Sequence, residues 1–190
     1  MKDILKIRKL YELKKVYRAN SVEERKESSA EHTWSSMILA DYFLDIFEKE
    51  NFKPTLNREK VFQLLLYHDI VEIEVGDVSI HLEDQRIGKK EKELKAIEIL
   101  SKQVPKEMSK KIIELFYEYE MAETIEAKFA KAIDVLDAQI HELDYKSDWK
   151  GWTEDILRKH KKKKVEHFPI LDKFFEDLIK LLRTEGYFDV

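Results

Sequence analysis

The chain has 190 residues, of which 43% are hydrophobic and 39% charged, with a formal net charge of -4 and no cysteine. This length suits one domain with a sizeable core, and the charge balance supplies no basic field for binding nucleic-acid polymers. The lack of cysteine excludes disulfides, thiolate zinc sites and cysteine nucleophiles. No window approaches the roughly 20 apolar residues of a membrane helix. We therefore expect a cytoplasmic, single-domain protein over residues 1–190 with no membrane partner.

Long helices are expected, because only 4 glycines and 3 prolines interrupt the chain. Apolar residues recur at helical spacing over residues 3–18, and the polar residues 20–28 are predicted to form a loop. A second helix would be capped by Ser28 or Ser29, with Glu31 in its first turn, and would run to about residue 50. The residues expected on its inward face are Trp34, Ile38, Leu39, Tyr42, Phe43 and Ile46.

The rest of the chain also has a helical pattern. The apolar segment 58–68 predicts a short helix that is buried nearly all round, Gly76 ends the turn at 69–75, and 78–88 is predicted to be a loop. Further helices are predicted at 88–102, 105–121, 124–147, 151–161 and 166–184. The fold class is therefore an all-α bundle with its core in about residues 28–147 and the helices of 151–184 packed on it.

The basic run Lys159-His160-Lys161-Lys162-Lys163-Lys164 has two interpretations. Cations at a helix C-terminus complement the helix dipole, so the run can be a solvated helix end. The alternative is a phosphate-binding patch. From the sequence we prefer the solvated helix end.

The strongest chemical signal is His68-Asp69 at the end of the most apolar helix, followed by Glu72. Burying an imidazole and a carboxylate there is costly unless they are paired or bind a cation. Together they suit a divalent transition metal. Glu72 follows His68 by four residues, so a helix would place it on the same face, where a carboxylate can act as general base or acid.

Two adjacent residues cannot complete a metal's coordination, so further ligands must come from elsewhere in the chain. His32 precedes an apolar helical stripe, and Asp134 is a carboxylate inside an apolar helix segment. Asp137 lies three residues after Asp134 and would share its face, which makes it either a competing ligand or a residue that orients one.

Four motifs give the chain a resemblance to the HD superfamily. They are Glu31-His32-Thr33-Trp34, Tyr67-His68-Asp69-Ile70-Val71-Glu72, Gly76-Asp77 and Lys131-Ala132-Ile133-Asp134. With Arg18 at the predicted end of the leading helix, the pattern over roughly residues 1–147 is similar to the 5′-deoxynucleotidase branch, the YfbR-like and HD-domain-containing protein 2 sequences.

The resemblance implies a role for each matching residue. His32, His68, Asp69 and Asp134 would bind one divalent metal. Asp134 is preferred over Asp137 because it ends the Lys-x-x-Asp motif. Mn, Co, Ni, Fe or Zn suits two imidazoles and two carboxylates better than Mg.

The remaining matches imply substrate roles. Glu72 would activate water, Arg18 would bind the substrate phosphate, and Asp77 would lie near the sugar or orient the site. The chain departs from the pattern at Ala19, where some members carry a Trp that contributes to the sugar pocket.

The resemblance implies hydrolysis of (deoxy)nucleoside 5′-monophosphates by a homodimer. Aromatic residues near the C-terminus, including Phe168, Phe174, Phe175, Tyr187 and Phe188, are candidates for a dimer contact. The alternatives are an HD phosphohydrolase of nucleoside triphosphates or cyclic nucleotides, a non-catalytic nucleotide sensor, and an interaction protein that uses residues 159–164. The other histidines, His81, His141, His160 and His167, are interpreted as surface or structural, with His81 the least secure.

Overall fold

The computed structural model describes residues 2–78 and 87–188, and within them the chain is mainly helical. One small antiparallel hairpin, β1–β2, interrupts the helices. In chain order the elements are α1 (Lys2–Leu10), the 3-10 helix η1 (Tyr11–Lys15), β1 (Tyr17–Val22), β2 (Arg25–Ser28), α2 (Ser29–Lys49), α3 (Arg58–Tyr67), α4 (Glu72–Val75), α6 (Lys89–Gln103), α7 (Lys106–Met121), α8 (Ile125–His141), the 3-10 helices η2 (Glu142–Asp144) and η3 (Lys146–Trp149), α9 (Glu154–Val165) and α10 (Pro169–Thr184).

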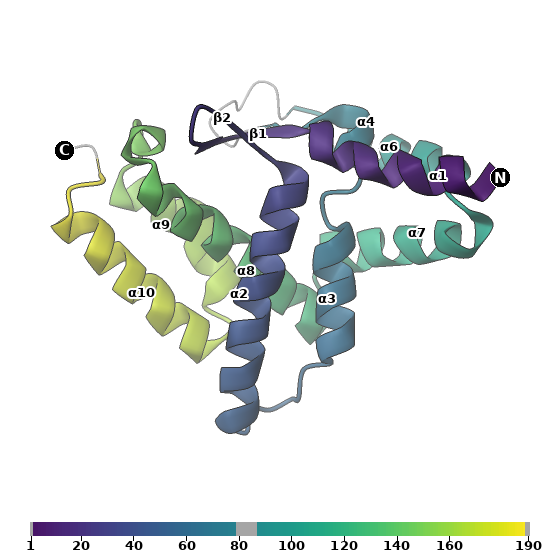
Figure 1. Ribbon diagram of the computed structural model, residues 1–190. Helices are drawn as coiled ribbons and strands as arrows, with labels where there is room; N and C mark the ends of the chain where they lie inside the picture. The colour runs from purple at the N-terminus through teal and green to yellow at the C-terminus, as the bar shows by residue number, and fades with distance from the viewer. Residues whose placement is uncertain (1, 79–86, 189–190) are drawn as a thin grey trace.

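The main hydrophobic core lies where α2, α3 and α8 pack together, with α9 packed on α8 and α10 packed on α9 (Figure 1). Small residues such as Ala40, Ala130 and Ala132 are fully buried in it and let the helix backbones approach closely. Phe47, Phe129 and Phe168 meet at ring-centroid distances between 5.4 and 5.8 Å. The all-α fold class is confirmed, and the C-terminal helices do pack on the central ones.

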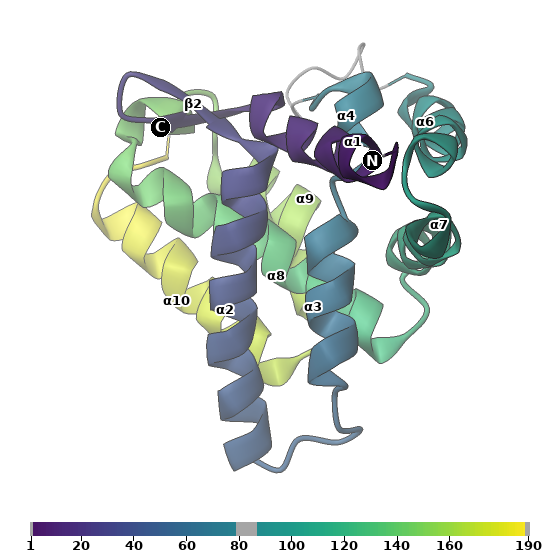
Figure 2. The same ribbon diagram turned by 45° about the vertical axis from the view of Figure 1, so that its right-hand side comes forward.

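A second hydrophobic cluster joins η1 and α4 to the paired helices α6 and α7 (Figure 2). Leu13, Ile97, Leu100, Ile112 and Phe116 are buried in it. Tyr67, at the end of α3, packs against both clusters, so the segment that carries His68 and Asp69 lies between them. Across the described residues, none of the helices has the length and apolar composition needed to cross a bilayer.

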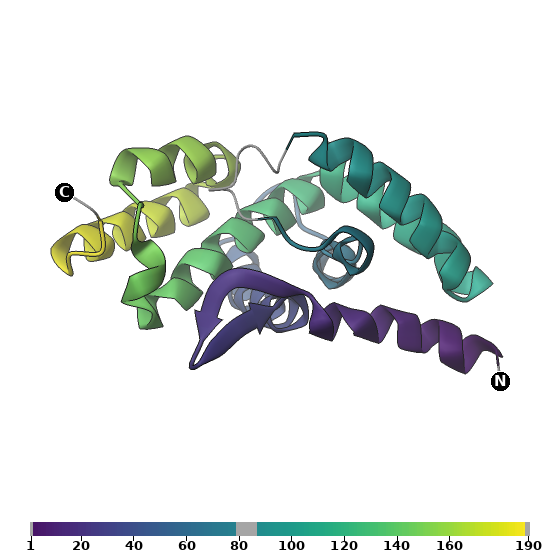
Figure 3. The ribbon, with the colours of Figure 1, turned by 90° about the horizontal axis from the view of Figure 1, so that it is seen from above.

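The prediction of one helix over 3–18 and a loop over 20–28 is wrong. Helical structure ends at Lys15, and the chain then forms the β1–β2 hairpin, which Figure 3 shows, with α1, across one end of the bundle. Arg18 therefore lies in a strand and not at a helix end. The turn lacks glycine, and Glu23 instead adopts a positive φ of 51°, so the sequence carries no standard hairpin signal.

The helix start at Ser28–Ser29 is confirmed, because Ser28 and Glu31 form a reciprocal capping box. The predicted inward face of α2 is wrong for three residues: Trp34 is 68% exposed, and Ile38 and Tyr42 are each 57% exposed. Small residues favour close packing, and the face that packs inward instead carries His32, Thr33, Ser36, Ala40, Phe43, Leu44 and Phe47.

Several predicted boundaries shift. α8 ends at His141 and is followed by 3-10 turns, since the Trp149 indole donates to the Glu142 carbonyl (2.9 Å) and folds the chain back. The helix α9 starts after Thr153, whose hydroxyl caps it. The helix α3 is not buried on all sides, because Leu66 is 45% exposed. Most of the predicted loop 78–88, with His81, lies outside the described residues.

Glu142, at the end of α8, ties the hairpin to the bundle. Its carboxylate accepts hydrogen bonds from Asn20 Nδ2 on β1 (2.9 Å) and Gln139 Nε2 (3.2 Å), and the side chain is buried. Burial raises the pKa of Glu142 to about 7, with Asp148 adding to the shift and Lys161 opposing it.

This raised pKa predicts a pH-dependent stability. Between the normal carboxyl pKa and about 7, the unfolded chain has lost the Glu142 proton while the folded chain keeps it, so the free energy of unfolding falls as pH rises. The variant Glu142→Gln has no titrating group at this position. Its free energy of unfolding relative to wild type should therefore increase from pH 4.5 to 7 by on the order of 2 kcal/mol and stay constant above pH 7.

Urea denaturation at a series of pH values measures this difference. Glu166→Gln, at an exposed position after α9, is the control and should follow the wild-type curve at every pH. A parallel pair of curves for Glu142→Gln and wild type would contradict the raised pKa.

Candidate active site

A cavity of about 550 Å³ opens between the hairpin, the α3–α4 turn, α6, α7, α8 and α9. Its walls carry many polar groups, with both cationic and anionic side chains among them. The residues most relevant to chemistry are Arg18, Ala19, Asn20, His68, Asp69, Glu72, Asp77, Asp134, Gln139, Glu142, Lys161 and Lys164.

Three of the four predicted metal ligands meet at one point. His32 from the first turn of α2, His68 from the end of α3 and Asp134 from the middle of α8 each offer a ligand atom within 4.8 Å of the others. The two imidazole rings lie 5.3 Å apart between centroids, and both residues are buried. Their short mutual distance is the geometry that a shared cation requires.

The hydrogen bonds orient both imidazoles toward that point. His32 Nδ1 donates to Asp137 Oδ2 (2.9 Å), and His68 Nδ1 donates to the Leu65 carbonyl (2.6 Å). Because a carboxylate or carbonyl only accepts, each imidazole carries a proton on Nδ1, and both Nε2 atoms face the cluster, where that of His32 lies 3.0 Å from Asp134 Oδ1. His68 Nε2 is buried and has no hydrogen-bond partner among the described residues, as a nitrogen kept for a metal would be.

Asp69 lies beside the cluster and not within it. Its Oδ2 is 3.2 Å from His68 Nε2 and accepts a hydrogen bond from Arg18 Nη1 at 3.3 Å. Arg18 is held on its other side by Glu27, with Nε 3.2 Å from the carboxylate. The guanidinium is thus fixed in the wall of the cavity, next to the proposed metal position.

The charges of this region fit a cation. Asp134 belongs to the cluster and the carboxyl groups of Asp69 and Glu72 lie near it, and Arg18 interacts electrostatically with all three. Burial alone would raise the pKa of Asp134, yet the hydrogen bond from His32 and the charge of His68 hold it well below its usual value. Imidazole nitrogen with carboxylate oxygen is the donor set of transition-metal sites.

His32 responds to the same carboxylates. Burial and Arg18 oppose its protonation, but hydrogen bonds to Asp134 and Asp137 prevail and raise the pKa of His32 to about 10. The proton on His32 therefore supplies positive charge that a bound cation would supply in its place.

Glu72 places a buried carboxyl group beside the cluster. It is the first residue of α4 and is buried, and its Oε2 accepts a hydrogen bond from Ser29 Oγ (2.6 Å). Burial, with the nearby charges of Asp69 and Asp77, raises the pKa of Glu72 well above its usual value. A carboxyl group with a raised pKa can exchange a proton near neutral pH.

Some contributors were missed by sequence reasoning. Tyr119 donates its hydroxyl proton to Asp134 Oδ2 (2.9 Å), and Ser35 donates to Asp137 (2.7 Å). Ser29, which holds Glu72, was considered only as a helix cap. None of the three stands in a recognisable motif, because each acts across elements that only folding brings together.

The other residues singled out in the sequence lie in the cavity wall, at the hairpin, at the surface or in the core. Asp77 and Ala19 both line the cavity. His141 is structural, since its Nε2 donates to the Ser21 carbonyl (2.8 Å), and His167 is exposed. Of the aromatics considered for a dimer contact, Phe168 and Phe175 are fully buried in the core, and Phe174, Tyr187 and Phe188 pack against it.

The interpretation of residues 159–164 as a solvated helix end holds in part, because Lys159, Lys163 and Lys164 are exposed and the last three lysines lie in the final turn of α9. It is incomplete, because half-buried Lys161 and exposed Lys164 also line the cavity, whereas Lys163 does not. The helix α9 continues to Val165, four residues beyond the predicted end, and this extra turn carries Lys164 to the cavity wall.

Comparison with known proteins places this geometry in context. The HD domain family profile matches residues 10–171. The 5′-deoxynucleotidase hdd1 of Schizosaccharomyces pombe is 32% identical over 163 residues, covering 71% of this chain and 77% of that protein. The 5′-deoxynucleotidase HDDC2 of Xenopus laevis is 30% identical over 148 residues, covering 76% and 70%.

A solved structure agrees with the same assignment. The predicted metal-dependent phosphohydrolase from Magnetospirillum magnetotacticum MS-1 superimposes with a TM-score of 0.86 at 28% identity, over 100% of this chain and 95% of that one. With the family profile spanning most of the sequence and the structure matching end to end, this chain belongs to the HD domain family.

Proposed function

We propose that this protein is a metal-dependent phosphomonoesterase that hydrolyses (deoxy)nucleoside 5′-monophosphates to nucleoside and phosphate. The observation that carries the proposal is the convergence of His32, His68 and Asp134 within 4.8 Å, beside the buried carboxyl group of Glu72. Relatives named 5′-deoxynucleotidase support the substrate class.

In this proposal His32, His68, Asp69 and Asp134 hold one divalent cation, with Mn, Co, Ni, Fe or Zn preferred over Mg. Asp69 lies close enough to His68 to join the other three after a small change of side-chain conformation. When bound, such a cation holds the phosphate and lowers the pKa of a water molecule. Asp137 and Tyr119 keep His32 and Asp134 in place from behind.

The chain's own groups supply the proton transfer and the charge neutralisation. Glu72 accepts the proton of the attacking water or protonates the leaving 5′-oxygen, while Ser29 fixes its Oε2. Arg18, positioned by Glu27 and Asp69, stabilises negative charge on the phosphoryl group. Asp77, which follows Gly76 and lines the cavity, lies near the sugar or orients the site.

A substrate panel tests the proposed activity. The metal-loaded protein should release phosphate from nucleoside 5′-monophosphates, with Mn or Co added and metal content measured in parallel. Preference for deoxy over ribo substrates would show whether discrimination survives with Ala19 in the sugar pocket. Turnover of only nucleoside triphosphates or cyclic nucleotides favours the alternative phosphohydrolase, and nucleotide binding without turnover favours a sensor.

Replacing the proposed acid–base group should separate chemistry from metal binding. Glu72→Gln keeps the shape but cannot accept a proton, so kcat should fall by about 100-fold or more with metal content unchanged. Glu98→Gln, at an exposed position of α6, is the matched control and should retain wild-type kcat. Wild-type kcat in Glu72→Gln would remove Glu72 from the mechanism.

We also propose that the protein is a homodimer, through α2 and not through the C-terminal aromatics. Trp34, Ile38 and Tyr42 follow one another at four-residue spacing, so they form one exposed apolar stripe. Two copies related by a two-fold axis can bury the same stripe against itself. The cytoplasmic location stays a prediction of the sequence.

The dimer proposal is tested by sedimentation analysis. Wild type should sediment at twice the mass of one chain, and Trp34→Asp with Ile38→Asp should yield monomer, because charges would be buried in an apolar contact. Ile99→Asp, at a 45% exposed position of α6, should stay dimeric. Monomeric wild type at micromolar concentration would overturn the proposal.

A further inference from the structure

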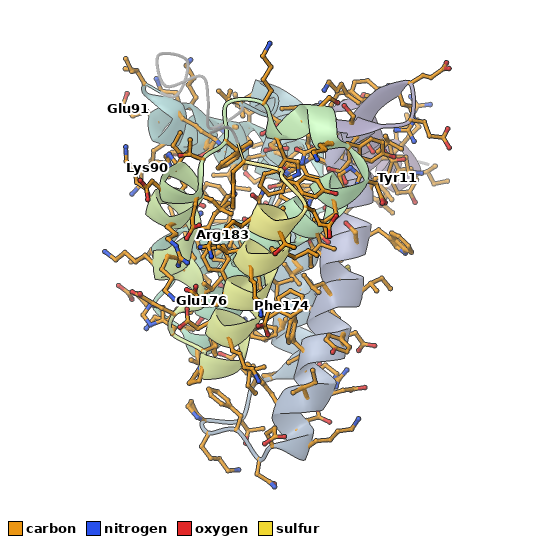
Figure 4. All side chains as sticks on the ribbon, turned by 90° about the vertical axis from the view of Figure 1, so that its left-hand side faces the viewer. Tyr11, Lys90, Glu91, Phe174, Glu176 and Arg183 are labelled. Carbon is orange, nitrogen blue, oxygen red and sulfur yellow. The ribbon has the colours of Figure 1, made fainter. Side chains whose placement is uncertain are left out.

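The helix α9 presents its lysines to two different environments. Lys162 is neutralised by α10, with Nζ 2.6 Å from Asp172 and 2.7 Å from Glu176, which Figure 4 labels on that helix. Lys161 and Lys164 lie three residues apart and line the cavity on the other side. One short run of lysines therefore contains both a structural cation and two cations that face the site.

Lys161 has the environment of a ligand-binding cation. Its ammonium group makes no hydrogen bond or ion pair with the described residues, although the acidic groups Asp134 and Glu142 are near enough to act on it electrostatically. Burial and the charge of Lys164 lower the pKa of Lys161 to about 8. A cation in this position gains an interaction when an anion enters the cavity.

Both lysines also act electrostatically on groups of the candidate site. Lys164 lowers the pKa of Asp134 through its charge, and Lys161 interacts electrostatically with both Asp134 and Arg18. Arg18 on β1 and the two lysines on α9 are thus positive groups on different walls of the cavity, which Lys89, Lys90 and Lys131 also line. A phosphate dianion has three terminal oxygens, which two walls can contact together.

We propose that Lys161, assisted by Lys164, binds the substrate phosphate from the α9 wall of the cavity while Arg18 binds it from β1. The inference rests on the proposed function only in that the substrate carries a phosphate group. It assigns to the C-terminal helices a part in substrate binding in addition to covering the core. Lys161 is then a substrate-binding residue, and Lys162 a structural one.

Phosphate binding tests this assignment without turnover. Calorimetric titration of inorganic phosphate into the metal-loaded protein should give a Kd about 10-fold weaker or more for Lys161→Gln, and about 3-fold weaker for Lys164→Gln, because each variant loses a charged hydrogen bond. Lys163→Gln is the matched control, and its Kd should stay within about 2-fold of wild type because Lys163 is exposed and, unlike Lys161 and Lys164, does not line the cavity. Lys161→Arg should restore most of the affinity.

The outcomes are distinct from those of the proposed function. Equal Kd values for Lys161→Gln and Lys163→Gln would overturn the inference and show that Lys161 only offsets the charge of Glu142. Phosphate binding too weak to measure in the wild-type metal-loaded protein would overturn it as well. If the nucleotide panel shows no turnover but Lys161→Gln still weakens phosphate binding, the nucleotidase proposal fails and the phosphate site stands.

Discussion

The structure depends on an excess of carboxylate at the inner wall of the cavity. Asp69, Glu72, Asp134 and Asp137 gather around two buried imidazoles, with Arg18 held among them. Such a cluster is stable only when positive charge is present, either as a proton on His32 or as a cation. Affinity for a cation and the protonation of His32 thus both follow from the same excess of negative charge.

This requirement explains how the helices are packed. The segments α2, α3 and α8 each carry one candidate ligand, so their close packing through small residues also sets the distance between the three side chains. The face of α2 that carries His32 must turn inward, and the larger apolar side chains of Trp34, Ile38 and Tyr42 are left outside as a consequence. The packing of these helices and the geometry of the candidate site therefore cannot be changed independently.

The hairpin and α9 close the cavity over this centre. β1 positions Arg18, and its Asn20 bonds the end of α8 through Glu142. On the other wall, the ion pairs of Lys162 and Arg158 with Glu176 fix the rotation of α9 against α10, which directs Lys161 to the cavity. Residues remote from the ligands thus determine which charges a substrate meets.

The sequence by itself determined the all-α class, the capped start of α2 and the residues of the H…HD…D motif, because helical periodicity and motif spacing are local properties. Only the tertiary structure decided that Arg18 stands in a strand, that Trp34 faces outward and that Lys161 faces the cavity. Each of these depends on which face of an element finds a partner. Residues 34, 38 and 42 are as apolar and as regularly spaced as a core face, so periodicity alone could not choose between the two sides of α2.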